Sequence, residues 1–279
     1  MSFIDQIING HRSVLRTLSI TWNYKSLLFY TLLSSLVSSF VFAVVSLLLG
    51  FGVVGIYKTF EQWTQALGKV LNVYTVLALV AVLIFNYWIK VIFSAALLRR
   101  VMEILHRKDM TFSESFDFGK QLNKKLFFWS VVFIVVVAFI LVSSIYIPQI
   151  TKYYLVYFLL MGWFIGTLFV LPVLIKRNLS LGKAIKKAFV MVWKHIIEII
   201  SATVAMIFYM LLIGFIVGVT GLGLTWLACY LLNVPLGIGL IMPFILVIVV
   251  PTLLLGWYFA TVIMALPATL YHSVVEGLK

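Results

Sequence analysis

Charged residues are scarce in this chain. Only 10% of its 279 residues are Asp, Glu, Lys or Arg, whereas 64% are hydrophobic. A soluble domain carries about 25% charged residues, and a chain this apolar could not hide its hydrophobic surface from water. The composition therefore excludes an ordinary soluble protein and indicates an integral membrane protein.

Cysteine and acidic residues are also rare. The single cysteine, Cys229, lies in an apolar stretch, so no disulfide can form within the chain and the residue is interpreted as a small packing group. Eight acidic residues stand against 21 basic ones, which gives a net charge of +13. Basic residues on a membrane protein are usually topology and lipid signals. We therefore expect the bilayer and its anionic phospholipids as partners, together with other membrane proteins, and no nucleic acid.

Sequence motifs of enzymes are missing as well. The chain has no phosphate-binding loop, no Cys-x-x-Cys pair and no G-x-S-x-G nucleophile pattern. Glu103 and His106 have the spacing of half a carboxylate-bridged metal site, but that design needs a second copy, which the sequence does not contain. We therefore expect no enzyme activity, no metal and no cofactor.

Long apolar runs occupy most of the chain, and each can supply the roughly 20 residues that cross a bilayer. They are residues 27–57, 72–98, 126–147, 153–175, 196–218 and 241–271. The sequence thus predicts an all-α polytopic bundle of about six transmembrane helices. Glycines four residues apart favour close helix packing at Gly162 with Gly166 and at Gly214 with Gly218. Residues 219–239 are apolar and rich in glycine, and they fit a seventh span, a re-entrant pair or a buried outer loop.

An amphipathic stretch precedes every second apolar run. Between Leu181 and Trp193 apolar residues recur at helical spacing after Ser180, a favourable N-cap residue. The opposite face carries Lys183, Lys186 and Lys187. Such a helix typically lies in a membrane interface. Residues 4–22 and 111–125 have a milder form of this pattern, so we predict three helical hairpins, each preceded by a cytoplasmic interfacial helix.

The same order of elements is predicted three times along a single domain, residues 1–279. The three units would cover residues 4–100, 110–177 and 180–275. Each would begin on the same side of the membrane, unlike the inverted repeats of many secondary transporters. The arrangement therefore disfavours a carrier that rocks between two inverted halves.

Basic residues are concentrated on one side of the predicted bundle. They flank the N-terminal stretch and the connections after the second and fourth runs, whereas the other side has only Lys58, Lys69 and Lys152. The positive-inside rule then places both termini in the cytoplasm, and we expect a multi-pass protein of the prokaryotic inner (cell) membrane. The candidate contacts with anionic lipid are Lys176, Arg177, Lys183, Lys186, Lys187 and Lys194.

Lys90 is the one basic residue deep inside an apolar run. It lies nine residues before Arg99, which is about 13 Å along a helix, and a lysine there costs about 2.5–3.5 kcal/mol on insertion scales. Asn86 shares its helical face, and Glu198, just inside the fifth run, is a candidate partner. The three residues form a candidate polar site for an anion or a lipid headgroup. Alternatively, Lys90 snorkels to the surface and Glu198 pairs with Lys194 at i, i+4.

Several segments resemble an uncharacterised prokaryotic family of six-helix integral membrane proteins, a domain of unknown function. They are Phe3-Ile4 with Ile8-Asn9-Gly10, Ser26-Leu27-Leu28-Phe29 with Leu32-Leu33-Ser34, Phe93 to Leu97, and Trp163 with Thr167 to Leu174. The chain departs from the family at Tyr30, where a proline is usual. The resemblance implies six helices with cytoplasmic amphipathic segments and no established activity. A looser likeness links the chain to the membrane-anchor domain of glycerophosphodiester phosphodiesterases, whose catalytic domain has no counterpart in these residues.

Two functional classes follow from these patterns. The first is a non-enzymatic protein that organises the membrane, interacts with lipid or assists other membrane proteins, and the basic amphipathic stretches favour it. The second is a channel or transporter for a small solute, an anion or a lipid, and Asn86 and Lys90 favour it. A cavity that reaches Lys90 would distinguish them.

Overall fold

The computed structural model describes residues 2–48, 73–108, 110–143, 149–177, 179–231 and 250–276. In chain order its helices are α1 (Phe3–Asn23), the 3₁₀ turn η1 (Lys25–Leu27), α2 (Leu28–Leu48), α5 (Val73–Leu105), α6 (Phe112–Gln121), α7 (Asn123–Ser143), α8 (Gln149–Gly166), α9 (Val170–Arg177), α10 (Leu181–Lys194), α11 (Ile196–Leu231) and α13 (Val250–Glu276). No strand occurs in these ranges, so the predicted all-α class is confirmed.

The helices that could cross a membrane also agree with the predicted bundle. Five spans are long and apolar enough: Val80–Leu105, Asn123–Ser143, Tyr154–Arg177, Ile196–Gly221 and Pro251–Val275. A sixth candidate is the amphipathic α1 together with η1 and the start of α2, two segments bent by 94° where they meet. The fold is therefore a polytopic helical bundle with five or six spans.

The structure shows how the chain continues at two places where the sequence was ambiguous or predicted a single span. Helix α11 continues without a break to Leu231, so the first part of residues 219–239 extends the fifth span as helix. The fourth apolar run is interrupted by a turn at residues 167–169, between α8 and α9. The rest of the ambiguous stretch, from residue 232, lies outside the described residues, as does the outer connection at residues 58–71.

A short or amphipathic helix precedes a long apolar helix three times along the chain. Helix α1 comes before α2, α6 before α7 and α10 before α11. This order matches the predicted hairpins. The division of a single domain into repeats at residues 4–100, 110–177 and 180–275 stays a prediction.

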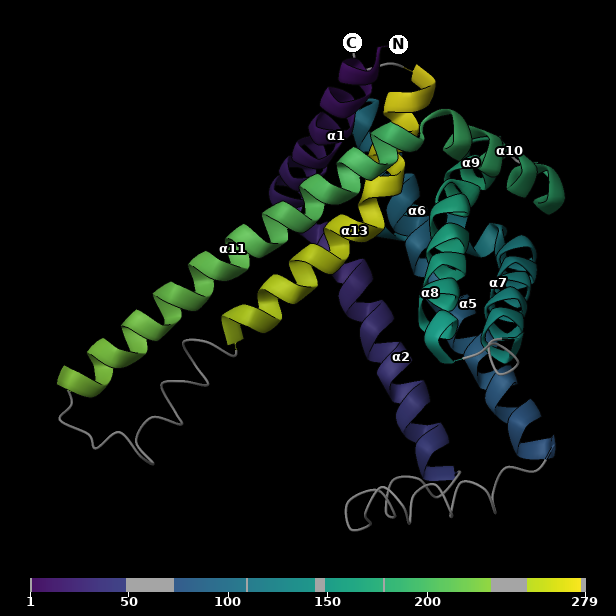
Figure 1. Cartoon of the computed structure of the whole chain (residues 1–279), viewed down its shortest axis with the longest axis horizontal. Coiled ribbons are helices and arrows are strands. Elements are labelled where there is room, and N and C mark those ends of the chain that lie inside the picture. The colour runs from purple at the N-terminus through teal and green to yellow at the C-terminus, as the bar shows by residue number, and fades with distance from the viewer. Residues whose placement is uncertain are drawn as a thin grey trace.

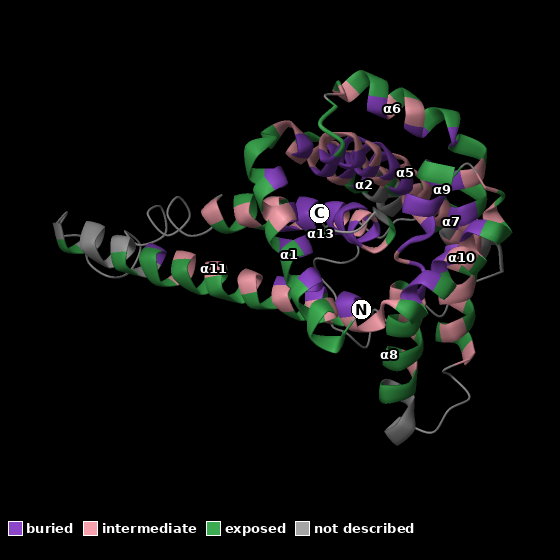
Figure 2. Ribbon diagram, turned by 90° about the horizontal axis from the view of Figure 1, so that it is seen from above, coloured by how far each residue is buried: buried purple, intermediate pink, exposed green. Residues whose placement is uncertain are grey.

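The hydrophobic core lies at one end of the bundle. The long helices converge at the end where both chain termini lie and spread apart away from it (Figure 1). Buried positions on α5 begin at Val91 and those on α13 begin at Phe259. Those on α11 run from Glu198 to Met206, near the converging end, with Gly221 as an exception further along the helix. Seen from above, most of the projecting arm of α11 is exposed or half-buried (Figure 2). Tertiary packing therefore holds the helices mainly at their basic ends.

Helix α6 begins with a capping box and packs against α5. The hydroxyl of Thr111 accepts the backbone N–H of Glu114, whose carboxylate accepts the backbone N–H of Thr111. These bonds, the one from the Thr111 backbone first, lower the pKa of the Glu114 carboxyl below its usual range. On the other face, Gly119 approaches Ile92 of α5 closely. The apolar face of α6 is thus used for packing on the protein.

The predicted glycine pairs are only partly used for packing. A side chain at Gly166 would overlap the ring of Phe189 on α10. Around Gly162, Gly214 and Gly218, however, no described atom outside the local helix lies within 4 Å of the Cβ position. The expectation of close packing at both pairs was therefore wrong, because these three glycines point away from the converging core.

Candidate functional site

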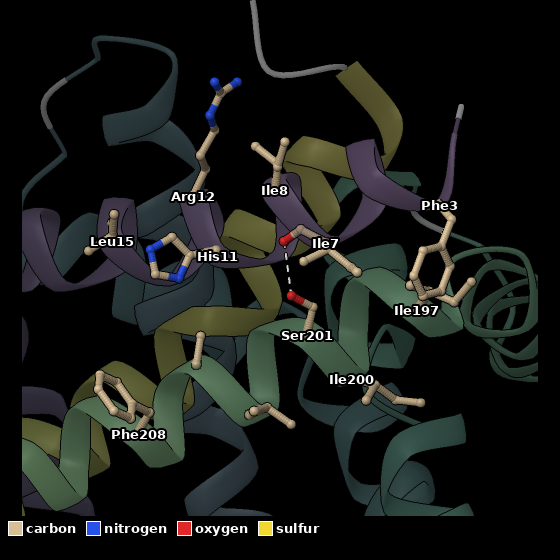
Figure 3. Close-up of a pocket in the computed structure, with 12 residues that line it drawn as sticks. Phe3, Ile7, Ile8, His11, Arg12, Leu15, Ile197, Ile200, Ser201 and Phe208 are labelled. Atoms are coloured by element: carbon tan, nitrogen blue, oxygen red, sulfur yellow. Dashed lines mark hydrogen bonds between the residues drawn. The ribbon is translucent and has the colours of Figure 1, made fainter.

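A groove of about 950 Å³ lies between α1 and the first turns of α11 (Figure 3). This volume is within the about 300–1,000 Å³ typical of ligand pockets. The residues that line the groove are Phe3, Ile7, Ile8, His11, Arg12 and Leu15 on α1, and Ile197, Ile200, Ser201, Val204, Ala205 and Phe208 on α11. Its walls are thus almost entirely apolar, with two basic side chains on one side.

The orientation of α1 explains why the groove is apolar. The face of α1 that packs on the protein carries mostly small or polar residues, whereas most of its large apolar side chains point outward. The buried set is Asn9, Gly10, Ser13, Val14, Thr17, Ile20 and Thr21. The exposed set is Phe3, Ile4, Ile7, Ile8, Leu15 and Trp22. The apolar stripe of α1 is therefore free to contact lipid and to form one wall of the groove.

Gly10 sets the distance between α1 and α11. A Cβ at this position would lie 2.9 Å from the backbone nitrogen of Ala202 and still closer to the carbonyl oxygen of Glu198. Beside this crossing, the hydroxyl of Ser201 donates a 2.9 Å hydrogen bond to the carbonyl of Ile7. Only glycine allows this approach, and the two helices diverge from it to form the groove.

The two basic side chains of the groove, His11 and Arg12, are both on α1. His11 leans toward α11, where its Nε2 and the hydroxyl of Tyr209 are 3.3 Å apart. Arg12 is exposed and extends to the far side of α1, away from α11 (Figure 3). A positive charge thus stands beside the apolar groove without entering it.

Glu198 is fully buried next to the groove, where α11 meets α13. Its Oε1 accepts a short hydrogen bond from the hydroxyl of Ser273 on α13. Its Oε2 lies 3.4 Å from Nδ1 of His195. The alternative pairing of Glu198 with Lys194 does not form, because α10 ends at Lys194 and α11 begins anew at Ile196.

Asn86 and Lys90 lie elsewhere, on α5. Asn86 bonds with α2: its Oδ1 accepts a 2.6 Å hydrogen bond from the hydroxyl of Ser38. The side chain of Lys90 is exposed, and no ion pair joins it to Glu198 in the described part of the chain. The structure therefore places the three predicted residues in two separate surroundings. On α5, Asn86 faces α2 and Lys90 is exposed, whereas Glu198 lies inside the contact between α11 and α13.

The predicted lipid contacts lie on α9 and α10. Lys176, Arg177, Lys183, Lys186 and Lys194 are exposed, and Lys187 is half-buried. The apolar face of α10 divides into two parts. Its small residues Ala184 and Ala188 are buried against the protein, whereas Trp193 is 83% exposed. Helix α10 thus presents lysines and a tryptophan to its surroundings.

Glu103 and His106 have other partners than a metal. Arg99 forms a 2.6 Å ion pair with Glu103, one helical turn away. Nδ1 of His106 lies 2.6 Å from the carbonyl oxygen of Met102. Within the described ranges, no three His, Cys, Asp or Glu side chains come together as a metal site.

Comparison with protein-family models, with curated proteins and with solved structures found no match to this chain. Function is therefore inferred from the geometry of the molecule. The resemblance to the six-helix family stays a prediction.

The groove was not predicted from the sequence. In the sequence, residues 4–22 have only a mild amphipathic pattern, and His11 and Arg12 interrupt its apolar face. A signal was nevertheless present, since Asn9, Ser13, Thr17 and Thr21 recur every four residues and mark a second face of small polar groups. That face is the one that packs on α11 and α13.

Proposed function

We propose that this protein is a non-enzymatic component of the prokaryotic inner membrane that gathers anionic phospholipid at the cytoplasmic surface. The proposal depends on the side chains that helix α10 exposes. Lys183, Lys186 and Lys194 are exposed on it, and the neighbouring Trp193 has 83% of its surface exposed. Tryptophan is favoured at the level of lipid headgroups, and lysines beside it contact anionic ones.

The charge on α10 is not neutralised within the helix. The sequence between Leu181 and Lys194 contains no acidic residue. Each basic residue near an anionic leaflet contributes about 1 kcal/mol of attraction, which falls off within a Debye length of about 8 Å at physiological salt. Three exposed lysines therefore provide enough attraction to enrich anionic lipid around the protein or to seat an accessory partner at such a surface.

The test is a comparison of lipid enrichment in reconstituted vesicles. Energy transfer from a label on the protein to fluorescent phosphatidylglycerol measures the local excess of anionic lipid. Replacing Lys183, Lys186 and Lys194 together by glutamine should lower this excess, by about fivefold for each charge at low salt. The matched control replaces the same lysines by arginine, which keeps the charge and should keep the excess. Equal enrichment around the glutamine and arginine variants would refute the proposal.

A channel or transporter for a small solute, an anion or a lipid is the second candidate. The hydrogen bond between Ser38 and Asn86 provides polar groups between two spanning helices, and the exposed Lys90 lies one turn from Asn86. This candidate predicts solute flux in vesicles that Lys90→Leu abolishes. Flux that Lys90→Leu leaves unchanged would reject this role for Lys90.

A further inference from the structure

We infer that the groove between α1 and α11 binds one acyl chain of an anionic phospholipid, with the lipid phosphate held beside Arg12 and His11. The inference deepens the proposed function and rests on it in one respect: the lipid comes from the same leaflet that α10 contacts. It adds a defined site on a different pair of helices. The occupant is a single bilayer lipid, distinct from the diffuse layer of anionic lipid around α10.

The shape and lining of the groove fit a hydrocarbon chain. On α11 its wall is formed by Ile200, Val204 and Phe208, which are exposed in the structure. These residues belong to the first turns of the span Ile196–Gly221, so the groove lies at the level where acyl chains begin. Because it is open along its side, a lipid can enter from the bilayer without passing through water.

The polar groups of the groove floor are already satisfied. The hydroxyl of Ser201 donates to the carbonyl of Ile7, and His11 has the hydroxyl of Tyr209 as a neighbour. A polar solute would find few hydrogen-bonding groups there, and burying its own polar groups without partners would be unfavourable. The floor therefore selects a ligand that is apolar along its length.

The edge of the groove selects the sign of the headgroup. Arg12 and His11 are its titratable lining residues, and no acidic side chain lines it. The carboxylate of Glu198, next to the lining residue Ile197, is fully buried and accepts its hydrogen bond from Ser273. Asp5 on α1 is exposed but does not line the groove. An apolar body with a negative end is therefore the ligand that matches both parts of the groove. A phospholipid such as phosphatidylglycerol has this structure.

Native mass spectrometry of the full chain, released from membranes of phosphatidylglycerol and phosphatidylethanolamine, tests the site. The wild-type protein should retain one phosphatidylglycerol. Val204→Trp fills the groove and should lower this occupancy at least about tenfold, the equivalent of about two lost methylene contacts. The control is Leu211→Trp, two turns further along the same face of α11 and equally exposed, but outside the groove. It should leave the lipid bound.

A second pair of variants tests the headgroup without altering the groove walls. Arg12→Gln should reduce the preference for phosphatidylglycerol over phosphatidylethanolamine about fivefold. Lys25→Gln removes another exposed charge, away from the groove, and should leave the preference unchanged. Because Arg12 is exposed, its variant keeps the helix packing and gives an answer even if Val204→Trp does not fold.

The outcomes separate this inference from the proposed function. Phosphatidylglycerol that stays bound in Val204→Trp and is still preferred in Arg12→Gln would overturn the groove site, even if the α10 variants lose their enrichment. Loss of the lipid in these variants, with no effect of the α10 lysines on enrichment, would support the site and refute the proposed function. A groove that contains no lipid and cross-links from Val204 to another protein would overturn the inference in favour of a protein partner.

Discussion

Replacing Gly10 by alanine should separate α1 from α11 and destabilise the protein. A Cβ on residue 10 would lie 2.9 Å from the backbone nitrogen of Ala202, whereas ordinary contact begins at 3.4 Å, so the helices must part by at least 0.5 Å. A gap of 0.5–1 Å already removes about a quarter to a half of the dispersion attraction between the facing atoms. The obstacle is backbone on both sides, so no side chain can move aside to relieve it.

The expected magnitude is a balance of two effects. Forcing extra atoms into a packed contact costs about 1–3 kcal/mol, whereas alanine gains up to about 1 kcal/mol over glycine in a helix interior. The net loss should therefore be about 1–2 kcal/mol. It also weakens the bond from Ser201 to the carbonyl of Ile7, which spans the crossing.

The assay is unfolding of the purified protein in mixed micelles, with increasing sodium dodecyl sulfate and detection by tryptophan fluorescence. The matched control is Gly182→Ala on α10, where no described atom outside the local helix lies within 4 Å of the Cβ position. There only helix propensity changes, and the variant should be more stable than the wild type by up to about 1 kcal/mol. If Gly10→Ala is as stable as Gly182→Ala, the close crossing of α1 over α11 is refuted.

Further predictions concern the polar contacts between and within helices. Ser273→Ala leaves the buried carboxylate of Glu198 without its donor and should lower stability by about 1–3 kcal/mol in the same unfolding assay. Asn86→Leu removes the partner of Ser38 and should lower stability by about 0.6–1.7 kcal/mol, the range found for hydrogen bonds between membrane helices. The Glu114 carboxyl should titrate below an ordinary glutamate in carbon NMR, because its pKa is lowered in the fold. Its capping bonds therefore stabilise α6 above the unfolded pKa and are lost as the pH falls through the folded one, where amide exchange at the start of α6 should accelerate.

Each of these substitutions has a control in the chain. Thr203→Ala and Ser94→Ala remove hydroxyls that bond only to a carbonyl of their own helix, and both should change stability little. If these two control variants lose as much stability as Ser273→Ala or Asn86→Leu, then the hydrogen bonds between helices contribute no more to stability than those within one helix. For α6, Thr111→Ala should raise the pKa of Glu114 toward its ordinary value, and an unchanged titration would contradict the capping geometry.

The features predicted correctly are those that depend on near neighbours. Helix α10 begins directly after Ser180, as the spacing of apolar residues at three and four positions predicts. The number and class of the spans follow from apolar length alone, since a bilayer requires about 20 residues per helix. These predictions needed no knowledge of which helices touch.

The partners of the polar residues could not be predicted, because they are far apart in the chain. Glu198 bonds with Ser273, 75 residues later, and Asn86 with Ser38, 48 residues earlier. The charges suggested instead that Lys90 would pair with Glu198. A hydroxyl satisfies a buried carboxylate without a second charge, and hydroxyls are too common in this sequence to be recognised as partners.

The inner and outer faces of amphipathic helices were similarly ambiguous. On α10 the predicted apolar face contains both Ala188, which is buried, and Trp193, which is exposed. A soluble protein would bury both, but in a membrane the large side chain can face lipid while the small one lets the helix approach the protein. Size, more than hydrophobicity, decides which part of the face is inside.

Because the core lies at the converging end, each long helix has one part in which substitutions are restricted and another in which they are tolerated. At Ala95, Ala96 and Ala265, which are fully buried, an added methylene has no space to occupy. At Leu253 and Phe215, in the spread halves, the side chains are exposed, and lipid accepts any apolar residue of any shape. Among relatives of this protein, sequences should therefore diverge quickly in the spread halves of the spans and slowly at the converging end of the bundle. The rate of divergence along each helix would then mark the depth at which the helices meet.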